Sequence, residues 1–466
     1  MPHCWKIATL TLVTSAVPAG ATPGDELFVI SPSPAIESNA FGDSLGLHGE
    51  LGVVGAAGVW TQQIGGHAYV IDVVTGVIRS ELPLVSTDPD RLWVFGAGIG
   101  EGIALVGYQD EALSTYRNGV QRFDISDPDN PVYIDTLIPS DAVFTDSFGD
   151  AIAVDGNIAI IGVSGDDDNG GLSGSAYLFD ISTGAELSKL LPTDGGAVQQ
   201  FGFSVDIQGT TAIVGARWDD DLGTRSGSAY LFDISDPANP VQTAKITASD
   251  GQEQDFFGFD VAVSGDLALV GAIFEDERGF DAGAVYLYDI TDRTNPVETR
   301  KITPADANDT DDFGWTVALN ADTALIGSRT DDDLFPGGGS AYLFDVSDPN
   351  NPIEVVKMTP ADTSANATFG WSGDLDGGRA LIGANQSDVP AINAGQVYVF
   401  DAQLEPSGCS AADLAKPFGV LNFFDIAAFI GLFNSGDPAA DVAAPFGSLN
   451  FFDVSGYIGI YNLGCP

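Results

Sequence analysis

A Phe-Gly pair that returns at nearly constant spacing constrains the fold of this 466-residue chain more than any other feature. The pair begins at Phe41, Phe95, Phe148, Phe201, Phe257, Phe313 and Phe369, so successive copies lie 53–56 residues apart. Self-similarity at a fixed period is typical of propellers, solenoids and other repeat architectures. The sequence therefore predicts seven copies of one structural unit.

Each copy contains short runs that alternate partly between apolar and polar or small residues. A second Gly follows an apolar pair 13 residues after the Phe-Gly glycine, or 11 residues after it in copy two, as in "AIVG" ending at Gly215. A third Gly then opens a run such as "GSAYLFD" at Gly227, and "DISDPANPV" at Asp233 leads into the next run. Short alternating runs indicate strands, and Asp-Pro and Asn-Pro pairs indicate turns. Each copy is predicted to hold four strands.

Seven four-stranded units predict an all-β fold, a seven-bladed β-propeller over residues 25–401. Copy seven stops at Asp401 without a fourth strand, whereas "LFVISPSPAIESNAFG", residues 27–42, aligns with the fourth strand and linker of a repeat. The N-terminal strand is therefore expected to complete the last blade. This pairing would join the first and last blades and remove an open sheet edge.

Charge and the N-terminus limit the possible partners and the compartment. Seventeen Lys and Arg residues against 66 Asp and Glu residues give a net charge of −49, which disfavours nucleic acid and anionic lipid and favours cations or basic partners. Residues 1–21, with one Lys, an apolar stretch and a small-residue site, indicate a secretory signal peptide; a buried N-terminal strand is the alternative. No later apolar run is long enough for a membrane span. We expect a secreted or cell-surface protein.

The Phe-Gly pair, the apolar-Gly-Ala segment and the Gly-Ser-Ala-Tyr run together resemble the FG-GAP repeat, which builds the seven-bladed head of integrin α chains. The resemblance covers about residues 41–401 and implies the propeller fold. In that family a calcium loop lies between the Phe-Gly strand and the Gly-Ala strand. Here this interval is a tight turn, "VDGN" at Val154 or "IQGT" at Ile207, so that metal site is not expected.

Four acidic tracts follow the second Gly of copies three to six and are candidate calcium ligands. They are Asp166, Asp167 and Asp168; Asp219, Asp220 and Asp221; Glu275, Asp276 and Glu277; and Asp331, Asp332 and Asp333. Equivalent loops lie on one face, and clustered carboxylates in a Gly-rich loop suit Ca²⁺. The alternative is a solvated polar hairpin tip in a very acidic exported protein. Both interpretations remain open at this point.

Residues 409–466, which follow a short linker at residues 402–408, contain an internal duplication. "DLAKPFGVLNFFD" from Asp413 returns as "DVAAPFGSLNFFD" from Asp441, and an apolar, helix-like stretch follows each copy. Cys409 and Cys465 bracket the segment and form a candidate disulfide in an oxidising compartment.

The duplicated segment resembles a dockerin of the kind that ends in Gly-Cys and caps exported bacterial proteins. The resemblance implies an α-helical domain, calcium binding and a cohesin-like docking partner. The candidate ligands are Asp413, Asn422, Asp425, Asp441, Asn450 and Asp453. The loop is one residue longer than usual, and Asn422 and Asp425 also fit a helix cap, so ligand and cap both remain open.

Catalytic motifs are not evident. Only His48 and His67 remain after the predicted leader, and no Cys-x-x-Cys or His-Glu-x-x-His motif appears. We expect a non-catalytic binding, adhesion or scaffold protein with an unknown extracellular ligand. A component, enzymatic or not, of a polysaccharide-degrading assembly is one alternative, and a structural envelope protein is another. Unusual carboxylate pKa values in the central channel would favour an enzyme.

Overall fold

The computed structural model describes residues 21–404 except for residues 34–35, 37–38, 59–63, 87, 111–116, 142–146, 363 and 390. The chain divides into two units, Met1–Gln403 and Leu404–Pro466. Residues 1–20 of the predicted signal peptide and the whole dockerin-like segment lie outside the described residues, so these interpretations stay predictions.

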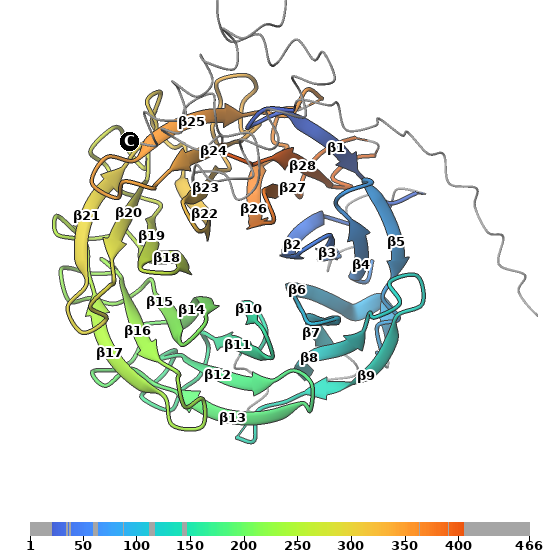
Figure 1. Ribbon diagram of the computed structural model, residues 1–466, viewed down its shortest axis with the longest axis horizontal. Coiled ribbons are helices and arrows are strands. Elements are labelled where there is room, and N and C mark those ends of the chain that lie inside the picture. Colours follow the sequence, from blue (N-terminus) through green and yellow to red (C-terminus); the bar gives the residue numbers. More distant parts are fainter. Residues whose placement is uncertain are drawn as a thin grey trace, which may run out of the picture. The chain divides into compact units, whose positions relative to one another are not determined.

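The first unit is a ring of seven four-stranded antiparallel sheets (Figure 1). Blade 1 contains β2 (Phe41–His48), β3 (Leu51–Ala56), β4 (His67–Asp72) and β5 (Val77–Glu81). Blade 2 contains β6 (Leu92–Gly100), β7 (Ile103–Asp110), β8 (Arg117–Asp124) and β9 (Val132–Leu137), preceded by the short 3-10 helix η2 (Pro89–Arg91). Blade 3 contains β10 (Ile152–Asp155), β11 (Ile158–Val163), β12 (Ser175–Asp180) and β13 (Ala185–Leu190).

The remaining blades repeat this order. Blade 4 contains β14 (Phe201–Gln208), β15 (Thr211–Ala216), β16 (Ser228–Asp233) and β17 (Val241–Ile246). Blade 5 contains β18 (Phe257–Ser264), β19 (Leu267–Ala272), β20 (Ala284–Asp289) and β21 (Val297–Ile302). Blade 6 contains β22 (Phe313–Asn320), β23 (Thr323–Ser328), β24 (Ser340–Asp345) and β25 (Ile353–Met358). Blade 7 contains β26 (Phe369–Asp376), β27 (Arg379–Ala384), β28 (Gln396–Asp401) and β1 (Glu26–Ile30). The prediction of seven four-stranded blades is confirmed.

The ring closes through the N-terminal strand, as the repeat pattern predicts. β1 pairs antiparallel with β28, with Val29 opposite Tyr398 and Ile30 opposite Val397. Leu27, Phe28 and Ile30 are buried in the same core cluster as residues of blades 1 and 7. Among the described residues, no helix is long and apolar enough to span a membrane.

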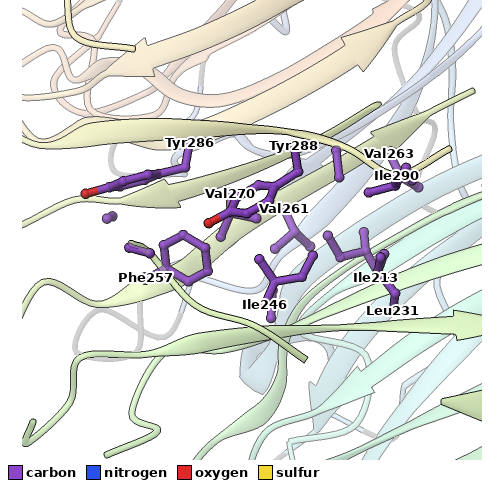
Figure 2. Packing of buried hydrophobic residues seen from close by; sticks show 14 of the residues in the cluster. Ile213, Leu231, Ile246, Phe257, Val261, Val263, Val270, Tyr286, Tyr288 and Ile290 are labelled. Atoms are coloured by element: carbon purple, nitrogen blue, oxygen red, sulfur yellow. The ribbon is translucent and has the colours of Figure 1, made fainter. Parts of the chain in front are cut away.

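The core lies between neighbouring blades because each sheet is covered on both faces by the next sheets of the ring. Figure 2 shows one such cluster, in which Ile213 and Leu231 of blade 4 pack near Val261 and Val263 of blade 5. In six blades the repeated Phe packs edge-to-face on the Tyr of the third strand, as Phe257 does on Tyr286 at 5.4 Å between ring centroids. Such pairs add to the area buried by the core.

The glycine of the Phe-Gly pair permits close contact with the preceding blade. Gly202 has a φ of +83°, and a Cβ added there would lie 2.1 Å from the carbonyl oxygen of Ser175 in blade 3. Only glycine tolerates both the backbone conformation and the approach. The repeated glycine is therefore a packing requirement of the ring.

Copy two departs from the prediction that all seven Phe-Gly pairs are equivalent. Val94 pairs with Tyr108 in the place where Phe201 pairs with Ala216, and Val94 is fully buried whereas Phe95 is 36% exposed. Gly96 also lacks the positive φ that the other six glycines have. The physical reason is length, because the register shift after Val94 contains one extra residue, whereas the shift after Phe201 contains two.

Candidate functional site at the mouth of the channel

The four acidic tracts lie in the loops between the second and third strands of blades 3–6. In a blade of four consecutive antiparallel strands, these loops lie at the same end of the strands as the segments that lead into the next Phe-Gly pair. We call the side of the propeller that carries these loops and segments the loop face. The first acid of each tract, Asp166, Asp219, Glu275 or Asp331, is buried, with at most 4% exposure, and the third acid is exposed. The tracts are thus not uniformly solvated hairpin tips.

A lysine ammonium lies between the first and third acids of every tract. Lys301 Nζ lies 2.7 Å from Glu275 Oε1, 2.8 Å from Glu277 Oε2 and 2.9 Å from Asp250 Oδ2. The same arrangement repeats at Lys189, Lys245 and Lys357. A carboxylate that is buried needs such a charged partner, since removal from water disfavours the ionised form.

The acids around Lys301 also have the spacing of metal ligands. Oxygens of Asp250, Glu275 and Glu277 lie within 4.8 Å of one another, the one such group among the described residues. The ammonium lies among these same oxygens, so a calcium ion there would have to displace it. The geometry does not test calcium binding, which stays a prediction.

Blade 7 shows that the lysine and the acids form one unit. Val29 of β1 stands opposite Tyr398 where Lys301 stands opposite Tyr286. In the same blade Ser387 and Val389 replace the first and third acids. The cation and the two tract acids are absent together, whereas Asp362, the counterpart of Asp250, remains and accepts a hydrogen bond from the Tyr398 hydroxyl.

The middle acid of the tract has a separate, structural role. Asp167 Oδ1 accepts a hydrogen bond from the backbone N–H of Leu172, and Asp220 and Asp276 accept equivalent bonds five residues on. These bonds hold the loop in a fixed turn. Asp332, the middle acid of blade 6, is exposed.

The remaining predicted ligands and the predicted Cys409–Cys465 bridge lie outside the described residues. These ligands are Asp413, Asn422, Asp425, Asp441, Asn450 and Asp453.

In blade 4 a half-buried side chain also contacts the first acid of the tract. In blade 4 the amide of Gln199 donates from Nε2 to Asp219 Oδ2 at 3.0 Å, while Gln199 Oε1 accepts from the backbone N–H of Gly196. In blade 6 Asp311 occupies the place of Gln199 and accepts from the backbone N–H of Asn308. Burial raises the pKa of Asp311 to about 7, and the neighbouring charge of Asp331 adds to this effect. Since Asp311 occupies the place of Gln199, we expect its protonated carboxyl to donate toward Asp331 as the Gln199 amide donates to Asp219.

This arrangement predicts that Asp311→Asn stabilises the protein at neutral pH. The folded state binds one proton more than the unfolded state between about pH 4 and pH 7, so wild-type stability falls as the pH rises through this window. The introduced amide does not titrate and keeps an N–H donor toward Asp331. We expect no difference at pH 5 and a gain on the order of 1–2 kcal/mol at pH 8 in urea unfolding. An equal effect at both pH values would contradict the shared proton.

The innermost strands enclose a central channel with a volume of about 700 Å³. Seven aspartates line it, and no lysine or arginine is found among its described lining residues: Asp43, Asp150, Asp155, Asp206, Asp260, Asp374 and Asp376. The channel therefore has a negative potential that favours cations.

Three of these aspartates connect neighbouring blades inside the channel. Asp206 accepts hydrogen bonds from its neighbour Ile207 and from the backbone N–H of Val263 in blade 5. Asp260 and Asp374 make the same bonds to blades 6 and 1. Burial raises the pKa values of Asp206 and Asp260 to about 7 and that of Asp374 to about 6. These side chains satisfy edge N–H groups of the innermost strands, which is a structural role.

The mouth of the channel on the loop face is lined by the residue that follows each Phe-Gly pair. In blades 4–7 these residues are aromatic and form a continuous row, the aromatic arc, with ring centroids 5.2, 4.6 and 5.0 Å apart: Phe203, Phe259, Trp315 and Trp371. In blades 1 and 3 the same position is Asp43 or Asp150, and in blade 2 Phe95 lines the channel. The fold does not require an aromatic residue here, because blades 1 and 3 form with an aspartate at this position.

The two mouth aspartates have perturbed pKa values. Burial raises the pKa of Asp43 to about 6, although Asn385 donates to it at 2.8 Å. Asp150 is exposed to water in the mouth, yet the surrounding protein desolvates it and raises its pKa to about 7. Desolvation thus raises the pKa values of both carboxyls toward neutral pH.

The sequence reasoning missed the mouth. Its residues vary between copies, so no shared motif marks them. The available signal was that the residue after Phe-Gly is Phe or Trp in four consecutive copies. Only ring closure brings these copies together around one axis.

Comparisons with known proteins agree with this architecture. The model of the FG-GAP repeat matches residues 134–179, 185–232, 240–288, 296–344 and 353–400, just over half of the chain. No curated protein matches. A chain in a crystal structure of a mitotic checkpoint complex is similar with a TM-score of 0.50 and 12% identity, over 85% of this chain and 99% of that chain. At this identity the likeness concerns the fold alone.

Proposed function

Because this chain belongs to the FG-GAP repeat family, whose propellers suggest a binding or scaffold role, we propose that it is a non-catalytic extracellular protein that binds a cationic group at the channel mouth. The observation that carries the proposal is the combination of seven channel aspartates with the aromatic arc, whose Phe and Trp rings are partly exposed except for the buried Phe259. The arc already holds two guanidinium groups of this chain, because Arg217 lies 3.5 Å from the ring centroid of Phe203 and Arg329 lies 3.3 Å from that of Trp315. A cation over aromatic rings and near carboxylates gains both cation–π and Coulomb energy. The dockerin-like segment would then anchor the propeller to a cohesin-like or cell-surface partner.

The net charge of −49 supports a basic partner. Long-range attraction raises the encounter rate with a positively charged protein or peptide and falls with added salt. Calcium in the acidic tracts is not part of this proposal, since the ammonium of a lysine already lies among the carboxylate oxygens that would bind it.

We expect a short peptide with one arginine to bind the full chain, and the same peptide with citrulline to bind at least tenfold more weakly. Trp371→Ala removes one ring of the arc and should weaken arginine-peptide binding about tenfold, as expected for the loss of a cation–π contact of about 1–2 kcal/mol. Titration calorimetry measures both constants.

Phe280→Ala is the matched control, because Phe280 is an exposed aromatic residue on the loop face but does not line the channel. Its affinity should equal that of the wild type. Equal binding of the arginine and citrulline peptides would rule out the cation site.

One observation favours a second candidate function, an enzyme that acts on polysaccharides. The raised pKa of Asp150 fits a general acid. Release of reducing ends from a panel of plant and bacterial polysaccharides, lost in Asp150→Asn, would establish this alternative. The absence of release by the wild type would leave the binding function.

A further inference from the structure

Two guanidinium groups lie on the loop face of blade 4 without an acidic partner. Arg217 directly follows β15, and Arg225 lies in the loop before β16. Among the described residues no carboxylate forms an ion pair with either, although most other cations on this face have one, as Lys245 and Arg329 do. In a chain with 66 acidic residues, two neighbouring arginines without an acidic partner are unexpected.

Aromatic rings hold the two groups in place. The Arg217 guanidinium carbon lies 3.5 Å from the ring centroid of Phe203, and its Nε donates to Gln200 Oε1 at 2.8 Å. The Trp218 ring lies 5.2 Å from Arg217 and 4.5 Å from Arg225. Trp218 Nε1 is buried and has no hydrogen-bond acceptor among the described residues. A buried donor without an acceptor is costly, and so is a half-buried cation without a counterion.

Blade 6 shows how the repeat neutralises an arginine at this position. Arg329 stands where Arg217 stands and lies 3.3 Å from the ring centroid of Trp315. Its Nε donates to Asp312 Oδ2 at 2.9 Å, and Asp312 occupies the place of Gln200. Blade 4 keeps the arginine and its aromatic support but has an uncharged amide in place of the acid. Burial and the neighbouring Arg225 lower the pKa of Arg217 to about 10, as expected for a cation that lacks its counterion.

We propose that Arg217, Arg225 and Trp218 form a binding site for a single carboxylate carried by a ligand with an aromatic or apolar body. The planar guanidinium matches a carboxylate in geometry, and the indole N–H supplies a third donor. The rings of Phe203 and Trp218 favour an apolar body beside the anion. The strongly negative protein disfavours a polyanion, so one isolated charge is the suitable ligand. The site shares Phe203 with the aromatic arc, so it lies beside the cation site at the mouth, and the two are distinguished by the charge of the ligand.

Benzoate is the probe, and benzamide is its neutral counterpart. Titration calorimetry of the full chain should show saturable binding of benzoate, at least tenfold tighter than benzamide. Acetate should bind more weakly than benzoate, because it lacks the ring. Absence of saturation by benzoate, or equal binding of benzamide, would overturn the proposal.

Gln200→Asp is the decisive variant, because it copies Asp312 of blade 6. Gln200 and Asp312 both have a φ of +53°, so the backbone accommodates the change. The variant keeps both arginines and supplies an internal counterion, and we expect benzoate affinity to fall at least tenfold without loss of thermal stability. Arg217→Gln should give the same loss.

Asn366→Asp is the matched control. Asn366 is exposed in blade 7, has a φ of +59°, and the change adds the same charge to the loop face. Benzoate affinity should remain within about twofold of the wild type. An equal loss in Asn366→Asp and Gln200→Asp would show a general charge effect and would overturn the site.

Discussion

Lys245→Met is expected to lower the free energy of unfolding by about 3–5 kcal/mol, because it leaves a buried carboxylate without its partner. Asp219 is fully buried and lies 3.0 Å from Lys245 Nζ, which also binds Asp194 and Asp221. Methionine retains most of the apolar length of the side chain, so the loss reports the charge. The measurement is guanidinium unfolding at pH 7, where all three acids ionise in the unfolded chain.

A triple variant separates loss of charge from loss of packing. Lys245→Val, Asp219→Ser and Asp221→Val together copy the residues that blade 7 has at these positions, Val29, Ser387 and Val389. This variant should recover most of the stability that Lys245→Met loses. A single-variant loss below about 1 kcal/mol would show that these ion pairs behave as ordinary surface pairs.

Gly227→Ala is expected to prevent folding or to cost more than about 4 kcal/mol, which is the range of severe core substitutions. Gly227 forms a bridge with Phe257 of the next blade, and a Cβ there would lie 1.9 Å from the Phe257 carbonyl oxygen. The φ of +83° adds conformational strain. Yield of soluble protein and thermal unfolding measure the effect.

Gly209→Ala provides the matched control. Gly209 has a φ of +59°, but no atom lies within 4 Å of a Cβ added there. This change should cost only about 1–2 kcal/mol, the strain of a left-handed residue. Equal losses in the two variants would show that backbone conformation, and not contact between blades, explains the regular recurrence of these glycines along the chain.

The propeller architecture could be predicted because the patterns that indicate it lie within short stretches of the sequence. Strand alternation, turn dipeptides and the constant Phe-Gly spacing all occur within single copies, and the missing fourth strand of copy seven has its counterpart at residues 27–42. Copy two was misaligned because "FG" at Phe95 matches by letter. The shorter distance to Gly107 was the available sign that its bulge is one residue shorter than in blade 4.

The chemistry of the acidic tracts was harder to predict, because each partner lies on another strand. Lys301 is 24 residues after Glu277 in the sequence and reaches it only when β20 and β21 pair. The correlated loss of all three residues in copy seven was visible in the sequence but has meaning only with this pairing. Residues at the channel mouth come from seven blades, so no single window of sequence contains the site.

The central claim, that the channel mouth binds a cation between the aromatic arc and ionised carboxyls, is tested most directly by the affinity of Asp150→Asn for the arginine peptide. Because burial raises the pKa of Asp150 to about 7 and that of Asp43 to about 6, wild-type affinity should increase as the pH rises from about 5.5 to 8. At pH 8 the variant should bind more weakly than the wild type, with a smaller pH dependence. If Asp150→Asn bound the arginine peptide with the same affinity and the same pH dependence as the wild type, the account would be contradicted.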